Sequence, residues 1–252
     1  MNDILTNTKP PKTPKSYLLV VQQRWQDALK TNGFIIKLLT TLSIAFFAAP
    51  QFPPYFINIQ KREGAYLSDF VLNHLPAVDV STPIFALIYG MLIFMLCRVL
   101  VKPQLFLLFT ITFVIETVLR MSTIYFFPLN PPLDLVHLHD TFAELLIYGD
   151  KEPITKDLFF SGHTATMVMI WLFLEKPWEK ALAVVTGVSI AVLLLIQHVH
   201  YTADVIGAFF FTALSYVIAR YINKQKWQTT CTVLLVFLVL LETIFWLGSK
   251  IV

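Results

Sequence analysis

Charged residues are scarce in this chain of 252 residues. Asp, Glu, Lys and Arg make up only 14% of it, whereas 56% of the residues are apolar and the mean hydropathy is +0.67. Soluble globular proteins carry roughly 25% charged residues, so this composition excludes an ordinary soluble protein. We predict a polytopic membrane protein with an all-α fold.

Cysteine is almost absent, and so are the glycine patterns of nucleotide sites. Cys97 and Cys231 both fall within apolar runs, which argues against a structural disulfide. The chain has no glycine-rich phosphate loop and no internal repeat. The net charge of +3 reflects membrane topology in our interpretation, and we expect no nucleic-acid partner.

Long apolar runs divide the chain into candidate spans of a hydrocarbon layer about 30 Å thick. They predict a bundle of six to seven transmembrane helices, at residues 34–52, 82–101, 104–127, 163–175, 180–198, 203–221 and 229–248. The fourth run is shorter than the others. The first run starts too late for a removable signal peptide and has no small-residue cleavage site, so we interpret it as an anchor.

Basic residues are distributed unevenly between the two ends of these spans. Most of the 19 Lys and Arg residues fall on the side of the N-terminus when the spans alternate in direction. Because such residues accumulate in cytoplasmic loops, we expect a cytoplasmic N-terminus. Segments 129–162 and 199–202 then share the opposite side, the periplasm, lumen or exterior. We predict a cytoplasmic basic tail with an interfacial helix in residues 1–33 and a transmembrane functional domain in 34–252, with core motifs at 116–210.

Four ionisable residues fall inside or at the start of the spans: Glu116, Arg120, Asp204 and Glu242. A charge in hydrocarbon costs several kcal/mol unless it is paired or hydrated. Glu116 and Arg120 are four residues apart on one helix and are spaced to neutralise each other. Alternatively, the Arg120 guanidinium clamps a phosphate with two hydrogen bonds. For Glu242 we expect a packing or inter-helix contact.

Two histidine motifs stand at the start of apolar runs, Ser-Gly-His-Thr at 161–164 and His-Tyr-Thr-Ala-Asp-Val at 200–205. His200 and Asp204 are four residues apart, so the carboxylate can hold one imidazole nitrogen and leave the other as a nucleophile. His163 follows a helix start, where free backbone N–H groups favour an anion. The combination indicates a phosphoryl-transfer site.

These motifs closely resemble the two signature motifs of the sphingomyelin synthase family, within the type 2 phosphatidic acid phosphatase superfamily. The resemblance includes Asp157, four residues before Ser161. Arg120-x-x-Thr123-x-Tyr125 is similar to the arginine-centred motif that the family carries at the end of its third helix. The resemblance covers roughly residues 70 to 215.

The resemblance implies a lipid phosphotransferase. His200 would be the nucleophile on phosphorus, Asp204 its orienting partner, and His163 the acid and base. A phosphohistidine intermediate would carry the head group, of phosphocholine or phosphoethanolamine type, from a glycerophospholipid donor to a lipid alcohol, ceramide or diacylglycerol. The resemblance implies no metal and no cofactor. Six residues are expected to contact substrate: Asp157, Ser161, Gly162, Arg120, Tyr125 and Tyr201.

The sequence departs from that family in three places. Thr155 and Lys156 stand where the family usually has Cys and Gly, in the region of the head-group contacts. The loop before them is shorter, which leaves open whether Asp140 or Glu144 supplies an additional acidic residue. The run at 229–248 is an extra helix after the family's six.

Three other functions stay open from the residues alone. In a lipid phosphate phosphatase or phospholipase C-like hydrolase, water would resolve the same phosphohistidine; the usual Lys followed seven residues later by Arg-Pro is missing here. A transporter or lipid-binding scaffold would use His163 and Asp204 only to line a polar cavity. A metal-dependent lipid hydroxylase or desaturase is the third, suggested by His137, His139, His163, His198 and His200. A homo-oligomer is also left open.

Overall fold

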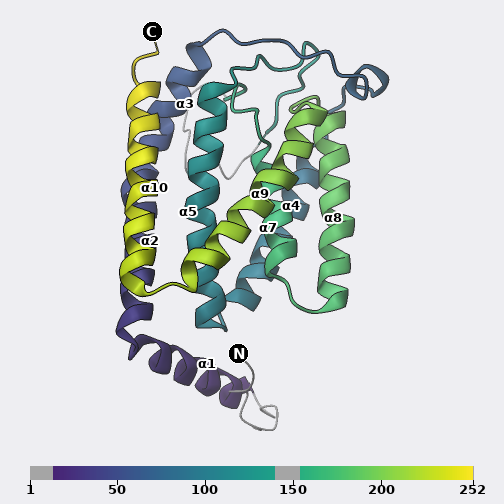
Figure 1. Cartoon of the computed structure of the whole chain (residues 1–252). Helices are drawn as coiled ribbons and strands as arrows, with labels where there is room; N and C mark the ends of the chain where they lie inside the picture. The colour runs from purple at the N-terminus through teal and green to yellow at the C-terminus, as the bar shows by residue number, and fades with distance from the viewer. Residues whose placement is uncertain (1–13, 140–153, 252) are drawn as a thin grey trace.

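The chain forms a bundle of helices with one further helix lying across its end (Figure 1). The computed structural model describes residues 14–139 and 154–251. Within these residues the regular structure is helical, and the only β-type pairing is an isolated parallel bridge between Ala65 and Leu129. The all-α fold expected from composition is confirmed.

Six helical units among the described residues are long and apolar enough to cross a membrane, as a multi-pass membrane protein requires. They are Asn32–Lys61, α4 (Ser81–Val99), α5 (Pro103–Phe126), α8 (Pro177–Ile196), α9 (Thr202–Asn223) and α10 (Trp227–Gly248). A seventh apolar helix, α7 (Gly162–Phe173), is shorter. The predicted runs therefore correspond to six full spans and one short helix.

The first span is longer than the 34–52 run predicts. Helix α2 (Asn32–Ala48) continues through a 3-10 turn, η1 (Ala49–Gln51), into α3 (Phe52–Lys61). Prolines occupy the first positions of both η1 and α3. A proline there removes an N–H group that would have no intrahelical partner, so the helix can change pitch without stopping.

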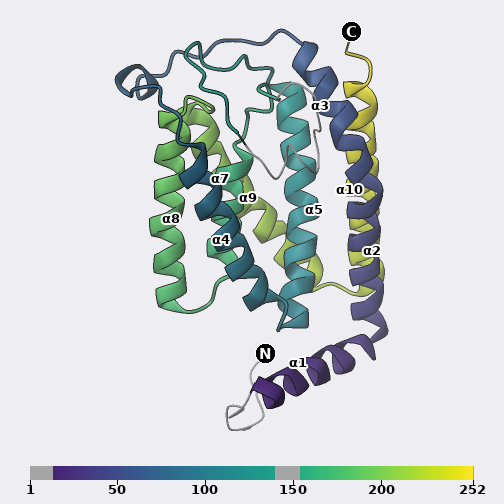
Figure 2. The ribbon, with the colours of Figure 1, turned by 180° about the vertical axis from the view of Figure 1, so that it is seen from behind.

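Helix α9 packs against both α5 and α7 and joins the two parts of the bundle. On one side α4 and α8 flank α7, and on the other side α10 packs against α2 and α5, as the view from behind shows (Figure 2). The predicted 229–248 run thus forms α10, which extends the bundle. Its Glu242 accepts a hydrogen bond from Gln51 Nε2 at 2.7 Å, which is the inter-helix contact expected for this carboxylate.

The helix across the end of the bundle is α1 (Pro14–Leu29). It is tied to the turn between α4 and α5, because Trp25 Nε1 donates to the carbonyl of Leu100 at 2.8 Å. Helices α7 and α9 both begin at the opposite end of the bundle, which we call the site end. The sidedness predicted for the two histidine motifs relative to each other is therefore found, whereas their orientation in a membrane stays a prediction.

The segment between α3 and α4 meets the segment that follows α5 over the site end. The first of them includes the short 3-10 turn η2 (Leu72–His74). Gly64 and Asn130 join them with two hydrogen bonds, Gly64 N to Asn130 Oδ1 at 3.2 Å and Asn130 Nδ2 to Gly64 O at 2.7 Å. A Cβ atom on Gly64 would lie 2.5 Å from the carbonyl carbon of Leu129. Only glycine lets the two backbones approach this closely.

Replacing Gly64 with Ala should therefore destabilise the protein, by about 1–3 kcal/mol, as overpacking typically does. Thermal unfolding of the detergent-solubilised protein measures the effect. Gly90→Ala in α4 is the matched control, because a Cβ there meets nothing within 4 Å. Equal melting temperatures for the two variants would show that the loops separate freely.

Candidate active site

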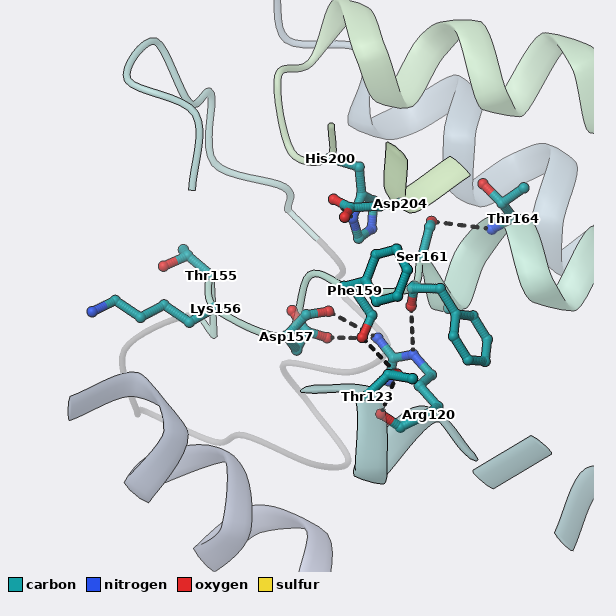
Figure 3. Close-up of polar contacts among 12 residues, drawn as sticks. Arg120, Thr123, Thr155, Lys156, Asp157, Phe159, Ser161, Thr164, His200 and Asp204 are labelled. Atoms are coloured by element: carbon teal, nitrogen blue, oxygen red, sulfur yellow. Dashed lines mark hydrogen bonds and ion pairs between the residues drawn. The ribbon is translucent and has the colours of Figure 1, made fainter. Parts of the chain in front are cut away.

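A non-helical segment, residues 154–161, leads into α7 and is largely buried, with Leu158 and Phe160 fully inside the protein. Arg120 on α5 donates hydrogen bonds to two backbone carbonyls of this segment. Arg120 Nε donates to the carbonyl of Phe160 and Arg120 Nη2 to the carbonyl of Asp157, both at 3.1 Å. The same Nη2 lies 3.1 Å from the Asp157 carboxylate (Figure 3). The guanidinium thus holds the segment at two positions, Asp157 and Phe160.

Thr123, one turn further along α5, completes this support. Its hydroxyl donates to the carbonyl of Phe159 at 2.8 Å. From the other side, α9 makes room for the segment at Gly207, where a Cβ atom would lie 2.9 Å from the Phe159 ring. The segment is therefore held between α5 and α9.

The two charged residues of α5 have different partners. Glu116 is buried and accepts a hydrogen bond from Thr212 Oγ1 of α9 at 2.8 Å, while the hydrogen bonds of Arg120 go to the segment before α7. The intrahelical pair weighed from the sequence is thus not the main contact of either residue. Within the described residues Arg120 Nη1 makes no hydrogen bond.

Ser161 starts α7 and connects it to α9. Its hydroxyl accepts from the backbone N–H of Thr164 at 3.3 Å and caps the helix. Its own N–H donates to the carbonyl of Asp204 at 3.1 Å. Gly162 lies directly against the arginine, because a Cβ atom there would be 3.0 Å from Arg120 Cζ. Ser161 therefore caps α7 and ties it to α9, and Gly162 lets the start of α7 approach Arg120 closely.

The two histidines face each other across this junction. The ring centroids of His163 and His200 are 6.1 Å apart, and Phe85 of α4 packs edge-on to His163 at 5.8 Å. His200 Nδ1 lies 3.4 Å from Asp204 Oδ2, a long hydrogen bond, which leaves Nε2 without a partner among the described residues. The structure therefore brings together all three residues predicted as catalytic.

Asp204 is fully buried and holds more than the imidazole. Its Oδ2 also accepts from the backbone N–H of Tyr201 at 2.8 Å. Its Oδ1 is buried and has no hydrogen-bond partner within the described residues. The carboxylate is thus fixed at the first turn of α9, with its charge directed at His200.

The two tyrosines predicted to contact substrate, Tyr201 and Tyr125, both have contacts within the protein. The Tyr201 hydroxyl donates to the carbonyl of Asn130 at 3.0 Å, and burial raises the pKa of Tyr201, so it stays protonated as a donor. Tyr125 packs in the cluster between α3, α5 and α10, and its carbonyl accepts from Arg62 Nη1 at 2.5 Å. Their roles in substrate binding stay predictions.

The two positions that depart from the family pattern point away from His200 (Figure 3). The backbone N–H groups of Thr155 and Lys156 donate to Gln60 Oε1 of α3 at 3.0 and 3.2 Å. Lys156 Nζ donates to the carbonyl of Arg62 at 2.5 Å. These residues dock the segment on α3. Asp140 and Glu144 lie outside the described residues.

Sequence reasoning missed Asp69. Its Oδ2 accepts from the N–H of Thr202 at 2.6 Å and its Oδ1 from the Thr202 hydroxyl at 2.9 Å, two residues after His200. Val71 and Leu72 donate to Oδ1 as well. Burial alone would raise the pKa of the Asp69 carboxyl, but these hydrogen bonds outweigh it and hold the pKa below its ordinary value. Nothing in the local sequence marks a partner 133 residues away.

Gln197 was also missed, and it fixes the chain just before His200. Its fully buried side chain accepts from Val80 N at 2.6 Å and donates to Ser81 Oγ at 2.9 Å and to the carbonyl of His137 at 3.0 Å. The turn between α8 and α9 is therefore held from two sides, by Gln197 and by Asp69.

The five histidines considered as metal ligands do not gather into one site. Within residues 14–139 and 154–251, no group of three or more His, Cys, Asp or Glu side chains is placed to hold a metal ion. His198 Nε2, for example, lies 3.3 Å from the carbonyl of Leu75. The hydroxylase alternative has no geometric support in this part of the chain.

Comparison with known proteins identifies one family. Residues 156–221 match the family model described as PAP2 superfamily C-terminal. The match covers about a quarter of the chain. It includes both histidine motifs and α9 as far as Tyr221. No curated protein and no solved structure matches the chain. The match supports a place in the PAP2-like superfamily.

Asp69→Asn should lower the stability of the protein by about 1–3 kcal/mol. Whichever way the amide is turned, its NH2 group faces a backbone N–H, either that of Thr202 or those of Val71 and Leu72, and leaves it without an acceptor. Because its pKa is lowered on folding, Asp69 contributes stability above its unfolded pKa and loses it as pH falls through the lower folded pKa. Thermal unfolding at several pH values should show a smaller acid destabilisation in the variant than in the wild type. Asp134→Asn, at an exposed loop position, is the control.

Proposed function

We propose that this protein is an integral-membrane lipid phosphotransferase that moves a phospho-head group from a glycerophospholipid to a lipid hydroxyl. The observation that carries the proposal is the approach of His163 and His200 to 6.1 Å between ring centroids, with Asp204 behind Nδ1 of His200. The PAP2 superfamily match supports phosphatase- or phosphotransferase-like activity on lipids. The resemblance of the motifs to sphingomyelin synthases favours transfer.

In the first half-reaction, the lone pair of His200 Nε2 attacks phosphorus and an N–P bond forms. The bond from phosphorus to the glycerol oxygen breaks, and this oxygen takes the electron pair. His163 donates its proton to the departing oxygen, which leaves as the hydroxyl of diacylglycerol. Asp204 accepts the Nδ1–H hydrogen bond and stabilises the positive charge on the phosphorylated imidazole.

In the second half-reaction, the hydroxyl of the acceptor lipid gives its proton to His163. Its oxygen attacks phosphorus, the N–P bond breaks, and the electron pair returns to His200 Nε2. The acceptor is a primary alcohol such as that of ceramide or diacylglycerol. Both half-reactions use the same two histidines in reversed proton roles, which is the expected course of covalent catalysis in two steps.

The phosphate oxygens have donors at the start of α7. The N–H groups of Gly162 and His163 have no acceptor among the described residues. The next two N–H groups of the helix, those of Thr164 and Ala165, donate to Ser161 Oγ and to the Ser161 carbonyl. A helix N-terminus of this kind favours an anion. The Arg120 guanidinium adds a positive charge beside these donors, because its Cζ, Nε and Nη2 atoms lie next to Gly162.

Hydrolysis is the second candidate, favoured by the superfamily match. In that reaction water would take the place of the acceptor hydroxyl in the second step. The first step and its residues are unchanged. The two functions therefore differ only in what reaches the phosphohistidine.

His200→Ala and His163→Ala should each lower turnover by at least about a thousandfold, because each removes a group that forms or breaks bonds in both steps. The measurement is mass spectrometry of lipids after incubation of purified protein with mixed glycerophospholipids, with and without ceramide. His74→Ala, an exposed histidine at the site end, is the control and should keep full activity.

A new phospho-head-group lipid that requires His200 supports transfer and identifies both donor and acceptor. Release of phosphate or free head group that requires His200, without a new lipid, would establish hydrolysis instead. Full turnover in either histidine variant would contradict the mechanism.

Arg120→Lys should lower kcat/KM by about ten- to hundredfold, the usual effect of losing hydrogen bonds to a charged group. A lysine cannot hold the segment before α7 and also present a second donor to phosphate. Kinetics with varied donor lipid and thermal unfolding of the same variant separate the two roles. Arg220→Lys, near the other end of α9, is the control. A loss of stability with unchanged donor kinetics would leave Arg120 with a structural role alone.

A further inference from the structure

A cavity of about 280 Å³ lies between α7, α8 and α9, outside the histidine pair. Helix α7 lines it from Thr164 to Leu172, α8 from Ala183 to Val188, and α9 with Phe209 and Ala213. The lining is aliphatic or aromatic except for the Thr164 hydroxyl and the indole N–H of Trp171. Its walls therefore suit a hydrocarbon ligand.

The shape of the cavity follows from the helices that form it. The α7 residues in its wall recur every three or four positions, which places them on one face of the helix. From Thr164 to Leu172 the cavity extends along α7 for about 12 Å at 1.5 Å per residue. It thus runs along α7 from the turn that carries His163 towards the end of the bundle opposite the site end, where α8 begins, along the direction that a lipid chain takes in a bilayer.

The side of the cavity is accessible to lipid. Val184 and Val188 on α8 and Phe209 on α9 are 49%, 55% and 50% exposed, although all three lie on helices long enough to cross a membrane. In a bilayer these side chains face hydrocarbon, so an acyl chain can enter between α8 and α9 without crossing a polar layer.

Thr164 is the one residue with a hydroxyl side chain among those that line the cavity. Its Oγ1 is buried and has no hydrogen-bond partner within the described residues, although the residue is only 1% exposed. A buried hydroxyl without a partner is unfavourable and calls for an explanation. Thr164 directly follows His163 in the chain, so this donor lies at the end of the cavity nearest to the proposed chemistry.

We propose that the cavity binds one acyl chain of a substrate lipid, with Thr164 Oγ1 donating to the ester or amide carbonyl at which that chain begins. This inference rests on the proposed function, and it applies to a chain of the donor or of the acceptor, which have the same chemistry. Bilayer lipids are as apolar as the cavity, so affinity comes from packing and from the Thr164 hydrogen bond rather than from transfer out of water.

Gly187 offers a direct test. A Cβ atom there would meet only Met167 Cβ, at 3.6 Å, which is ordinary contact, so the rest of a larger side chain extends into the cavity. Gly187→Leu fills the space from α8. Gly90→Leu adds the same atoms to α4, where a Cβ atom meets nothing within 4 Å, and serves as the matched control.

For long-chain substrates, Gly187→Leu should lower kcat/KM by about tenfold or more, the usual effect of blocking a hydrophobic pocket. For short-chain, water-soluble analogues with the same head groups, the variant should match the wild type, and Gly90→Leu should match it in both cases. Chain length is varied separately in donor and acceptor, and the one whose chain length matters is the occupant. Equal loss for long and short chains, or no loss, overturns the inference.

A second measurement works without turnover. In a His200→Ala background, a phospholipid with a photoreactive group on its acyl chain should label the 164–172 or 183–188 segment, and Gly187→Leu should remove at least about nine-tenths of this label, in line with a tenfold loss of occupancy. Labelling that Gly187→Leu does not change marks bulk bilayer lipid and overturns the inference. Absent turnover on every lipid, with labelling still lost in Gly187→Leu, would reject the proposed function and keep the cavity as a lipid-chain site.

Discussion

The hydrogen bonds between Arg120 and the segment before α7 determine where both histidines lie. Irregular backbone is tolerated among membrane helices only where protein satisfies its polar groups. Arg120 and Thr123 do so for three backbone carbonyls, those of Asp157, Phe159 and Phe160. With 12 residues, α7 is about 18 Å long and cannot cross about 30 Å of hydrocarbon alone. The supported segment supplies the missing length and places His163 at the helix start.

The second histidine depends on the first through the backbone. Ser161 N donates to the carbonyl of Asp204, and the Asp204 carboxylate in turn holds Tyr201 N and His200 Nδ1. A shift of α7 therefore moves the group that orients His200. Asp69, in the segment between α3 and α4, holds the start of α9 through Thr202. The two motifs, whose first residues Ser161 and His200 are 39 positions apart in the sequence, behave as one structural unit because the backbone hydrogen bond from Ser161 to Asp204 joins them.

The sequence predicts the parts of this arrangement that have a local signal. Hydropathy locates the spans, and the four-residue spacing of His200 and Asp204 predicts their contact. The continuation of α2 into α3 was not predicted, because prolines usually end a helix and here stand in its tolerated first positions. Asp69 and Gln197 were missed because the partners that tie them to the rest of the site, Thr202 and Val80, lie 133 and 117 residues away, and side-chain hydrogen bonds over such separations leave no periodic pattern.

The first turn of α7 carries both a residue of the histidine pair and a residue that lines the apolar cavity. Successive residues on a helix point about 100° apart, so His163 and Thr164 face different neighbours. His163 packs beside Phe85 of α4 and faces His200, whereas Thr164 lines the cavity between α8 and α9. An amphipathic substrate needs a polar reaction site and an apolar channel in fixed relation. Because both begin on the same turn of α7, the segment held by Arg120 would, under the proposed function, set the position of the phosphate and of the chain together.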